Sequence, residues 1–375
     1  MQLRLYDGVA AVAQSAWPKE EGGGLFVSRA WLAALEETGC VGGDTGWQPL
    51  PLALERDGQA VGLAPAYLKR HHRGEYVFDW AWAEAYARAG MDYYPKLVVA
   101  SPFTPVAGRR LLAAPEDRAA LIAGLRQLAD DNGLSSAHVL FPQADEAEAL
   151  AAAGWLLREG VQFHWRNQAY GDFDAFLDTL SRDKRKKIRQ ERRKVAEAGV
   201  TVRTLAGENI GAADWRLFFQ CYRQTYLEHR SAPYLNLAFF RLIGERLAKH
   251  CVMFVASRDG VDIAASLCII QGDVLYGRYW GALEPVACLH FELCYYQGLE
   301  YAIQTGLKCF EGGAQGEHKL ARGFEPVRTV SAHYIADARF REAIAAWLKR
   351  EREGVTDYVD KLFSHSAYKT LAQDE

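Results

Sequence analysis

Two stretches of the chain share one pattern: PLALERDGQAVGLAPAYL at 51–68 and VMFVASRDGVDIAASLCII at 252–270. In each, an Arg-Asp-Gly step separates two runs that are rich in apolar residues. Asp-Gly is a strong signal for the two-residue turn of an antiparallel hairpin. The two stretches therefore predict two β-hairpins, and their likeness indicates that the chain contains two copies of one unit.

Two further anchors recur in the same order. A Gly-Leu step closes a predicted helix and opens a strand at 133–134 and at 306–307. A Gly-aromatic step is followed, ten residues after the glycine, by a His-aromatic step, once from Gly154 to His164 and once from Gly323 to His333. The offsets between the copies are 202, 173 and 169 residues, so the first half carries about 29 additional residues between its hairpin and its Gly-Leu step.

The repeat predicts two domains, at 1–168 and 169–375, which meet at the polar stretch 167–172. Each half is expected to run helix, hairpin, strand, helix, strand and closing strand. That order is typical of an α/β protein with mixed sheets of the α+β type, and not of a doubly wound parallel sheet. The additional residues form an insertion at about 70–96 in the first domain.

The segment from Arg182 to Lys194 is strongly basic, with nine Lys or Arg residues against Asp183 and Glu191, while the whole chain has a net charge of −3. Apolar residues recur at helical spacing, which predicts one helix over 172–198 that ends at Gly199. Few acids stand at the i,i+4 positions that would balance the cations. We expect a polyanion to bind here, and a solvated helix face is the alternative. The candidate polyanion-binding residues are Arg185, Lys186, Lys187, Arg189 and Arg193.

The composition limits the class of protein. Hydrophobic residues make up 50% of the 375 residues and charged residues 24%, which is typical of a globular protein with a substantial core. No apolar run approaches the roughly 20 residues of a membrane span, and the first residues do not resemble a signal peptide. The seven cysteines form no Cys-x-x-Cys pair, so we expect reduced, mostly buried thiols, a cytoplasmic location and no metal site.

The order of elements resembles the acetyltransferase (GNAT) fold that Fem-type aminoacyltransferases use twice in tandem. The basic helix resembles the one that opens the second domain of that superfamily. Three further segments resemble the FemAB-like branch, which is described as a peptidoglycan biosynthesis or recognition family. They are YVFDWAW at 76–82, SPFTPV at 101–106 and FEGGAQGEHKLARGFEP at 310–326. The resemblance implies tandem duplicated GNAT-like acyltransferase domains.

The resemblance implies an acyltransferase that moves an aminoacyl group, carried by aminoacyl-tRNA, to an amine acceptor such as a peptidoglycan precursor or a small molecule. No permanently bound cofactor is expected. GNAT enzymes hold coenzyme A on main-chain N–H groups of a Gly-rich turn, and the corresponding turns, 280–286 and 105–110, lack repeated glycines. The alternatives are an acyl-CoA-dependent N-acyltransferase and a non-catalytic module that binds RNA or another polyanion.

The insertion holds seven aromatic residues between Tyr76 and Tyr94. Alternation at 76, 78, 80 and 82 predicts four rings on one face of an extended strand. Aromatic walls suit sugars, bases or peptides, so we interpret the insertion as an acceptor groove, and a core face is the alternative. The candidate acceptor residues are Asp79, Trp80, Trp82, Tyr94 and Lys96, with Phe103 and Thr104 closing the groove.

A second candidate cluster follows the predicted strand that ends at Glu311, in a segment interrupted by glycines. Glu311 or Glu317 would orient the attacking amine, with His318 as a further proton-transfer group. Lys319 and Arg322 would contact phosphate or carboxylate, and Gln315 would contact substrate. A flexible solvated loop is the alternative. His164 and His333, at equivalent positions of the repeat, are expected to be structural.

Overall fold

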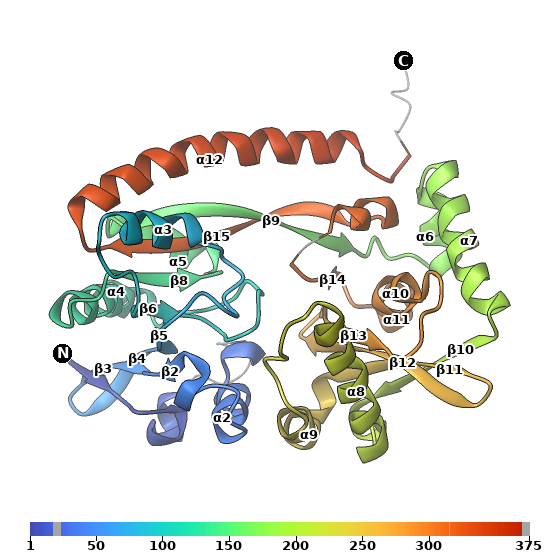
Figure 1. Cartoon of the computed structure of the whole chain (residues 1–375), viewed down its shortest axis with the longest axis horizontal. Coiled ribbons are helices and arrows are strands. Elements are labelled where there is room, and N and C mark those ends of the chain that lie inside the picture. The colour runs from blue at the N-terminus through green and yellow to red at the C-terminus, as the bar shows by residue number, and fades with distance from the viewer. Residues whose placement is uncertain (18–23, 315, 370–375) are drawn as a thin grey trace. The chain divides into compact units, whose positions relative to one another are not determined.

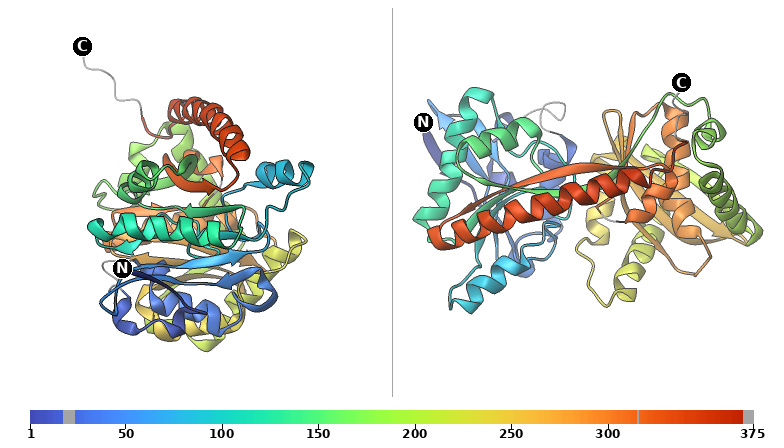
Figure 2. Two further views of the ribbon diagram at one scale, coloured as in Figure 1. Left: turned by 90° about the vertical axis from the view of Figure 1, so that its left-hand side faces the viewer. Right: turned by 90° about the horizontal axis from the view of Figure 1, so that it is seen from above.

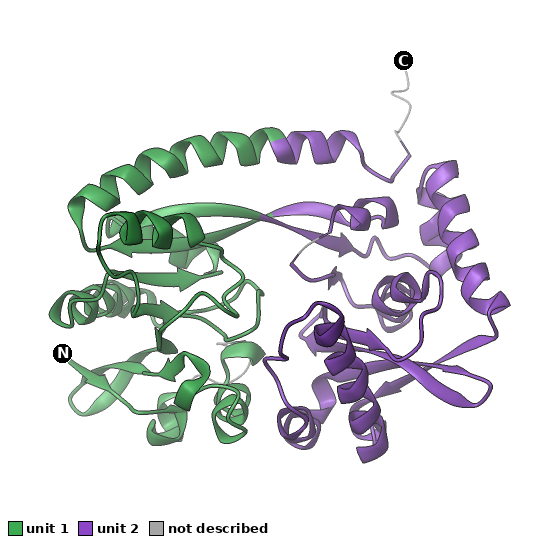
Figure 3. Cartoon of the chain, viewed as in Figure 1, with its two compact units in different colours: residues 1–160, 328–357 green, residues 161–327, 358–375 purple. Residues whose placement is uncertain are grey.

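The computed structural model describes residues 1–17, 24–314 and 316–369 and consists of two compact units. Unit 1 contains residues 1–160 and 328–357, and unit 2 contains residues 161–327 and 358–375 (Figure 3). The sequence-based division places all of 169–375 in the second domain, whereas the structure returns 328–357 to the first unit. The two divisions differ because the closing strands of the halves pair outside their own half.

Unit 1 holds two sheets. The smaller has the strand order β1-β3-β4-β7, and the larger follows the order β15-β8-β6-β5-β2 within this unit. The strands are β1 (Gln2–Leu5), β2 (Trp47–Pro49), β3 (Leu52–Arg56), β4 (Gln59–Ala64), β5 (Ala66–Lys69), β6 (Lys96–Val99), β7 (Leu112–Ala113) and β8 (Ser136–Leu140). The helices are α2 (Arg29–Glu37), α3 (Trp80–Arg88), α4 (Pro115–Asp131) and α5 (Ala144–Ala152). Apolar side chains of α4 pack against the strands, and those of α3 pack on residues of α12 (Ala338–Ser364).

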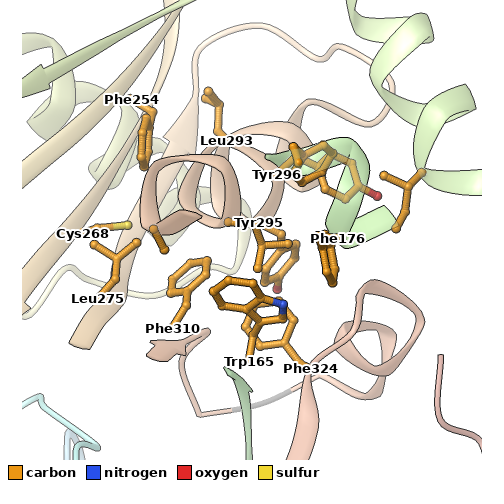
Figure 4. Packing of buried hydrophobic residues seen from close by; sticks show 14 of the residues in the cluster. Trp165, Phe176, Phe254, Cys268, Leu275, Leu293, Tyr295, Tyr296, Phe310 and Phe324 are labelled. Carbon is orange, nitrogen blue, oxygen red and sulfur yellow. The ribbon is translucent and has the colours of Figure 1, made fainter. Parts of the chain in front are cut away.

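Unit 2 holds a sheet in the order β10-β11-β12-β13-β14-β9 (Figure 1). Its strands are β10 (Val200–Ala206), β11 (Cys251–Arg258), β12 (Val261–Gln271), β13 (Val274–Ala282) and β14 (Cys309–Glu311). Its helices are α6 (Phe173–Thr179), α7 (Arg182–Glu197), α8 (Ala212–Glu228), α9 (Leu237–Arg246), α10 (Leu289–Phe291), the π-helix η7 (Glu292–Tyr296), α11 (Gln297–Thr305) and the 3₁₀ helix η8 (Glu317–Arg322). Figure 4 shows rings of η7, β14 and β9 meeting in its core.

Both predicted hairpins form, and they are alike in detail. Asp57 and Gly58 have positive φ angles of 52° and 76°, and Asp259 and Gly260 have 53° and 78°. Two consecutive positive φ values are the requirement of the turn that matches the twist of a hairpin. Each hairpin also has a register shift at the second and third residues before its turn. The shared irregularity confirms that the halves follow one plan.

The Gly-Leu steps also have one conformation. Gly133 ends α4 with φ 62°, and Gly306 ends α11 with φ 71°. In both copies the following leucine N–H donates to a carbonyl five residues earlier, Leu134 to Ala129 and Leu307 to Ala302. This is the bonding of a Schellman cap, which needs the left-handed residue that glycine supplies.

The closing strands β9 (Leu156–Arg166) and β15 (Glu325–Ile335) are each 11 residues long and leave the half in which they begin. In unit 2, β9 pairs antiparallel with β14, and His164 lies opposite Glu311. In unit 1, β15 pairs antiparallel with β8, and His333 lies opposite His138. The halves thus exchange their last strands, which a pattern of apolar residues does not reveal.

The predicted helix over 172–198 is wrong as a single element. It is two helices, α6 and α7, that break at Leu180, where a β-bridge forms with Tyr368. The predicted end is confirmed, since Gly199 follows α7 with φ 73°. The apolar stripe is buried across the break, so the periodicity identified the correct face.

Other expectations concern the thiols and the membrane. All seven cysteines are free, and Cys40, Cys221, Cys251 and Cys268 are buried. None of the helices in the described residues combines the length and the apolar composition that crossing a membrane requires.

Gly281 of β13 offers a stability test. A Cβ atom at this position would lie 1.8 Å from the carbonyl oxygen of Cys221 in α8. The main chain of α8 cannot move aside as easily as the end of a flexible side chain. We therefore expect Gly281→Ala to lower the free energy of unfolding by about 3 kcal/mol or to prevent folding. Gly171→Ala, where nothing lies within 4 Å of the new atom, is the control for urea denaturation. Equal stability of the two variants would contradict the packing of β13 on α8.

Candidate active site in the second unit

The site begins where two parallel strands part. β13 and β14 pair over three residue pairs, Val274 with Cys309 to Tyr276 with Glu311. β13 then continues to Ala282 along β12 alone, while β14 ends at Glu311. Among the described residues, no strand pairs with this edge of β13 beyond Tyr276.

A pocket of about 130 Å³ lies at this point. Drug-sized ligands occupy pockets of roughly 300–1,000 Å³, so this one suits an acyl or aminoacyl group and not a whole nucleotide carrier. Its lining consists of glycines, aromatic residues, cysteines, a serine, a leucine and a histidine, together with Arg278. The residues are Ser266, Leu267, Cys268, Gly277, Arg278, Tyr279, Trp280, His290, Cys294, Tyr295, Gly312 and Gly313.

Two local irregularities shape the pocket wall. The register of β12 and β13 shifts between Leu267 and Cys268, which leaves Arg278 as the additional residue of a bulge. Bulges commonly redirect a side chain beside a functional site. Cys294 and Tyr295 belong to the π-helical turn η7, which interrupts an otherwise α-helical run from Leu289 to Thr305, and such turns also occur often at functional sites.

Glu311 ends β14 next to this lining, as predicted. Its side chain is 14% exposed, and burial raises the pKa of its carboxyl to about 7, against the opposing charge of Arg278. Its Oε2 lies 3.7 Å from Nε2 of His164. Burial, together with the charges of Arg166 and Lys319, lowers the pKa of His164 to about 4. At neutral pH a partly ionised carboxyl therefore faces a neutral imidazole, a pair suited to proton transfer.

Lys319 supports the glycine turn that follows β14. Its side chain is 1% exposed, and its Nζ donates to the carbonyl oxygen of Gly313 at 2.8 Å. Burial lowers the pKa of the Lys319 ammonium to about 8. The amine is thus held against a residue of the pocket lining and titrates near neutral pH.

The other predicted residues of this segment have different positions. The His318 Nε2 atom lies 2.9 Å from the hydroxyl of Tyr295, so His318 is one residue removed from the lining. Glu317 is exposed and accepts a hydrogen bond from Tyr358 at 2.7 Å. Gln315 lies outside the described residues. Of the predicted catalytic set, Glu311 is thus the residue with both burial and a place beside the pocket.

Arg322 is not available to a ligand. The guanidinium is 2% exposed and donates to Glu191 at 2.7 Å, to the hydroxyl of Tyr296 at 3.0 Å and to the carbonyl of His318 at 2.7 Å. It also lies 3.6 Å from the ring centroid of Phe291. The predicted contact with phosphate or carboxylate is therefore wrong, because the charge joins α7 to η7.

The predicted acceptor groove does not form as an aromatic wall. Tyr76 has a φ of 62°, and α3 begins at Trp80, so the extended strand over 76–82 is wrong. Trp80 is 54% exposed, whereas Trp82 is 3% exposed and packs in the core. The remaining predicted acceptor residues are buried or half-buried in unit 1: Asp79, Tyr94, Lys96, Phe103 and Thr104.

The two turns that correspond to the coenzyme A turn of GNAT enzymes form hydrogen bonds within the protein. In the first half, the carboxylate of Glu146 accepts from the main-chain N–H groups of Arg110 and Leu111, and the Arg110 side chain donates to the carbonyl of Leu140. In the second half, Gly281 packs against α8, and the Leu283 N–H donates to Ile263. Part of the main-chain N–H groups of each turn is thus engaged within the protein.

Some of the cations of α7 form ion pairs and others do not. Arg185 and Arg189 pair with acids of α6, Asp178 and Asp174, at 2.8 and 2.9 Å. Arg192, which was not predicted, pairs with Glu292 and Glu300 of the helix beside the pocket. Three other predicted residues of α7 are exposed and form no ion pair within the described residues: Lys186, Lys187 and Arg193.

Sequence reasoning missed part of this site. His164 was interpreted as structural, and Arg278 and Tyr295 were not singled out. The pairing of His164 with Glu311 depends on the exchanged strand β9, for which the sequence contains no local signal. Arg278 gave a weak signal as a charged residue within an apolar strand.

The titration of Glu311 is testable through stability. The folded state holds the proton up to about pH 7, whereas the unfolded chain releases it near pH 4.5. The free energy of unfolding should therefore fall by up to about 3 kcal/mol through this carboxyl as the pH rises across that interval. Glu311→Gln removes this titration. Denaturation measured from pH 5 to 8 should therefore show the free energy of unfolding of the variant rising relative to that of the parent. A difference in free energy that does not change with pH would contradict the raised pKa.

Comparison with known proteins agrees with this architecture. The model of the FemAB-like family, described as peptidoglycan biosynthesis/recognition, matches residues 8–370. No curated protein matches the chain. The structure of FemX is similar with a TM-score of 0.54 and 12% identity, covering 92% of this chain and 100% of that one. The L-PGS structure from Bacillus licheniformis has a TM-score of 0.51 and 12% identity, covering 85% and 94%. A tandem GNAT protein from the clavulanic acid biosynthesis pathway has a TM-score of 0.45 and 14% identity, covering 90% and 99%. The structures of FemX and L-PGS share the fold of this chain, and with a family match over nearly its whole length, this chain belongs to the FemAB-like family.

Proposed function

We propose that unit 2 transfers an aminoacyl group from aminoacyl-tRNA to an amine acceptor, such as a peptidoglycan precursor. The observation that carries the proposal is the buried Glu311 carboxyl, which ends β14 beside the pocket with the neutral His164 opposite. A base with a pKa near the working pH is the group that deprotonation of an amine requires. Membership of a peptidoglycan biosynthesis and recognition family supports the acceptor class.

The reaction breaks the ester C–O bond of the carrier and forms an amide C–N bond. The attacking nitrogen loses a proton, which the ionised Glu311 accepts, and the leaving oxygen of the carrier gains one. His164 would hold the Glu311 carboxyl in place. The edge of β13 beyond Tyr276 would orient the carbonyl, and Lys319 would fix the glycine turn beside it. No covalent intermediate with the protein is needed.

Two features support tRNA as the carrier. The pocket volume of about 130 Å³ fits the acyl group alone, so the carrier would lie outside it. The exposed cations Lys186, Lys187 and Arg193 on α7 suit phosphates spread along a nucleic acid. Coenzyme A receives less support, because both turns lack repeated glycines and the N–H groups of Arg110, Leu111 and Leu283 bond within the protein.

Glu311→Gln tests the chemical step. We expect kcat for discharge of labelled aminoacyl-tRNA onto a peptidoglycan precursor to fall about 10²- to 10⁴-fold, since the amide accepts no proton. The activity of the parent enzyme should increase as the pH rises to about 7. The pH profile of the variant should lack this increase. The control is Lys361→Gln, a substitution at an exposed residue near the C-terminal end of α12. Unchanged turnover in Glu311→Gln would refute the assigned base, and activity with acyl-CoA alone would refute the carrier.

Charge reversal on α7 tests the carrier. The double variant Lys186→Glu, Lys187→Glu should weaken tRNA binding at least about tenfold and reduce the slope of log affinity against log salt by roughly 1.5. The matched control reverses two exposed arginines of α8, Arg216→Glu and Arg223→Glu, which gives the same change in net charge. An equal loss of tRNA affinity in both double variants would mean that binding depends on the net charge of the protein and not on α7. Binding that depends on α7 without any turnover would favour the non-catalytic RNA-binding alternative.

A further inference from the structure

Three rings meet at the surface of unit 1. The Trp80 ring lies 4.8 Å from Phe78 and 5.7 Å from His72, measured between centroids. Trp80 is 54% exposed and Phe78 41% exposed, and His72 is exposed as well. Among the exposed large hydrophobic residues of the described chain, Phe78 and Trp80 are the pair in ring contact. We call His72, Phe78 and Trp80 the ring cluster.

A buried ionic group holds the segment that carries Phe78 and Trp80. The Lys96 ammonium, which is 0% exposed, donates to Glu75 at 2.8 Å and also to Asp79. Asp79 accepts a second hydrogen bond from Tyr93 at 2.6 Å. Glu75 and Asp79 stand on either side of Phe78 in the sequence, so one lysine fixes both ends of the short segment between them.

The main chain is fixed at two more points. The guanidinium of Arg158 donates to the carbonyl oxygen of Phe78 at 2.7 Å. The carbonyl oxygen of Arg73 accepts from Lys69 and from the Trp47 indole, both at 3.0 Å. The second anchor holds the loop that carries His72. The ring cluster is thus fixed in place before anything binds to it.

This arrangement does not serve stability. Removing the charges of Glu75, Asp79 and Lys96 from water costs free energy that their attraction repays only in part. Leaving Phe78 and Trp80 in water forgoes the gain from burying two rings. A chain that buries ions while it exposes adjacent rings is organised for binding, because a fixed surface loses little entropy when a ligand arrives.

Between residues 70 and 80, the exposed charged side chains are both cationic. Arg70 and Arg73 flank His72 in the sequence, and both are exposed without an ion pair in the described part of the chain. Two acids of the same segment, Glu75 and Asp79, are buried on Lys96, and the exposed Glu84 of α3 pairs with Arg88. Helix α3, which Trp80 begins, projects from the rest of unit 1 in both views of Figure 2, so the rings stand on an accessible element.

We propose that the ring cluster binds an anionic saccharide, with the pyranose ring stacked on Trp80 and Phe78 and its carboxylate or phosphate held by Arg70 and Arg73. Sugar rings present apolar C–H faces that pack on aromatic rings, and guanidinium groups bind carboxylates with paired hydrogen bonds. The assignment of this sugar as the acceptor's carbohydrate portion rests on the proposed transfer to a peptidoglycan precursor. Binding of the sugar itself does not depend on that transfer.

The test is a binding titration of the full chain with two probes, N-acetylmuramic acid and N-acetylglucosamine, followed by ligand-observed NMR. The first probe carries a carboxylate that the second lacks. We expect saturable binding of N-acetylmuramic acid that Trp80→Ala and Phe78→Ala each weaken about tenfold. Phe363→Ala, at a 50% exposed ring outside the ring cluster, should change nothing. Arg70→Glu with Arg73→Glu should remove the preference for the anionic probe.

Several outcomes would overturn the proposal. Absence of binding by the parent chain at millimolar probe, or unchanged affinity in both ring variants, would do so. Sedimentation with phosphatidylglycerol vesicles that depends on Trp80, without saccharide binding, would assign the rings to a lipid surface instead. If Trp80→Ala unfolds, Trp80→Leu keeps apolar bulk without a flat face and must still lose affinity. Saccharide binding without aminoacyl transfer would leave this proposal standing and refute the proposed function. Transfer that is indifferent to Trp80 would leave the proposed function standing and refute the assignment of the sugar as the acceptor's carbohydrate portion.

Discussion

The site depends on a limit to strand pairing: β13 and β14 remain together for three residue pairs and then separate. Within the described part of the chain, the separation leaves an edge of β13 without a strand, and the pocket lies there with Glu311 at the end of β14 beside it. It also requires the exchanged strand β9 on the other side of β14, since His164 faces Glu311 from there. The pKa of Glu311 is raised because this arrangement buries the carboxyl without a close cation to compensate fully.

The two units share this geometry but use it differently. In unit 1, β6 and β8 also pair in parallel over three residue pairs. There the side chain of Arg110 donates to the carbonyl groups of Leu140 and Val106, and the carboxylate of Glu146 binds the adjacent N–H groups. Internal groups thus occupy the hydrogen-bonding positions in unit 1. Duplication therefore provided two similar frameworks, and the polar residues placed at each decide whether the opening stays available to a ligand.

Much of the fold was predictable because its signals are local. The turns at Asp57-Gly58 and Asp259-Gly260, the helix caps at Gly133 and Gly306 and the end of α7 each depend on residues within a few positions of one another. The break between α6 and α7 was missed because it depends on a contact between Leu180 and Tyr368, far apart in the sequence. The same reason explains Arg322: as a cation among glycines it resembles a ligand contact, yet Glu191, more than a hundred residues earlier, neutralises it.

The sequence by itself determined that the chain is a duplicated, mixed α/β protein, that α7 is basic and that Glu311 ends a strand before a glycine turn. These features follow from short-range propensity, spacing and composition. The tertiary structure decided which cations of α7 stay unpaired, that the rings at Phe78 and Trp80 lie outside while Trp82 lies inside, and that His164 faces Glu311. Each of those depends on partners brought together by strand exchange and packing, and burial, not residue type, sets the charge that a side chain carries there.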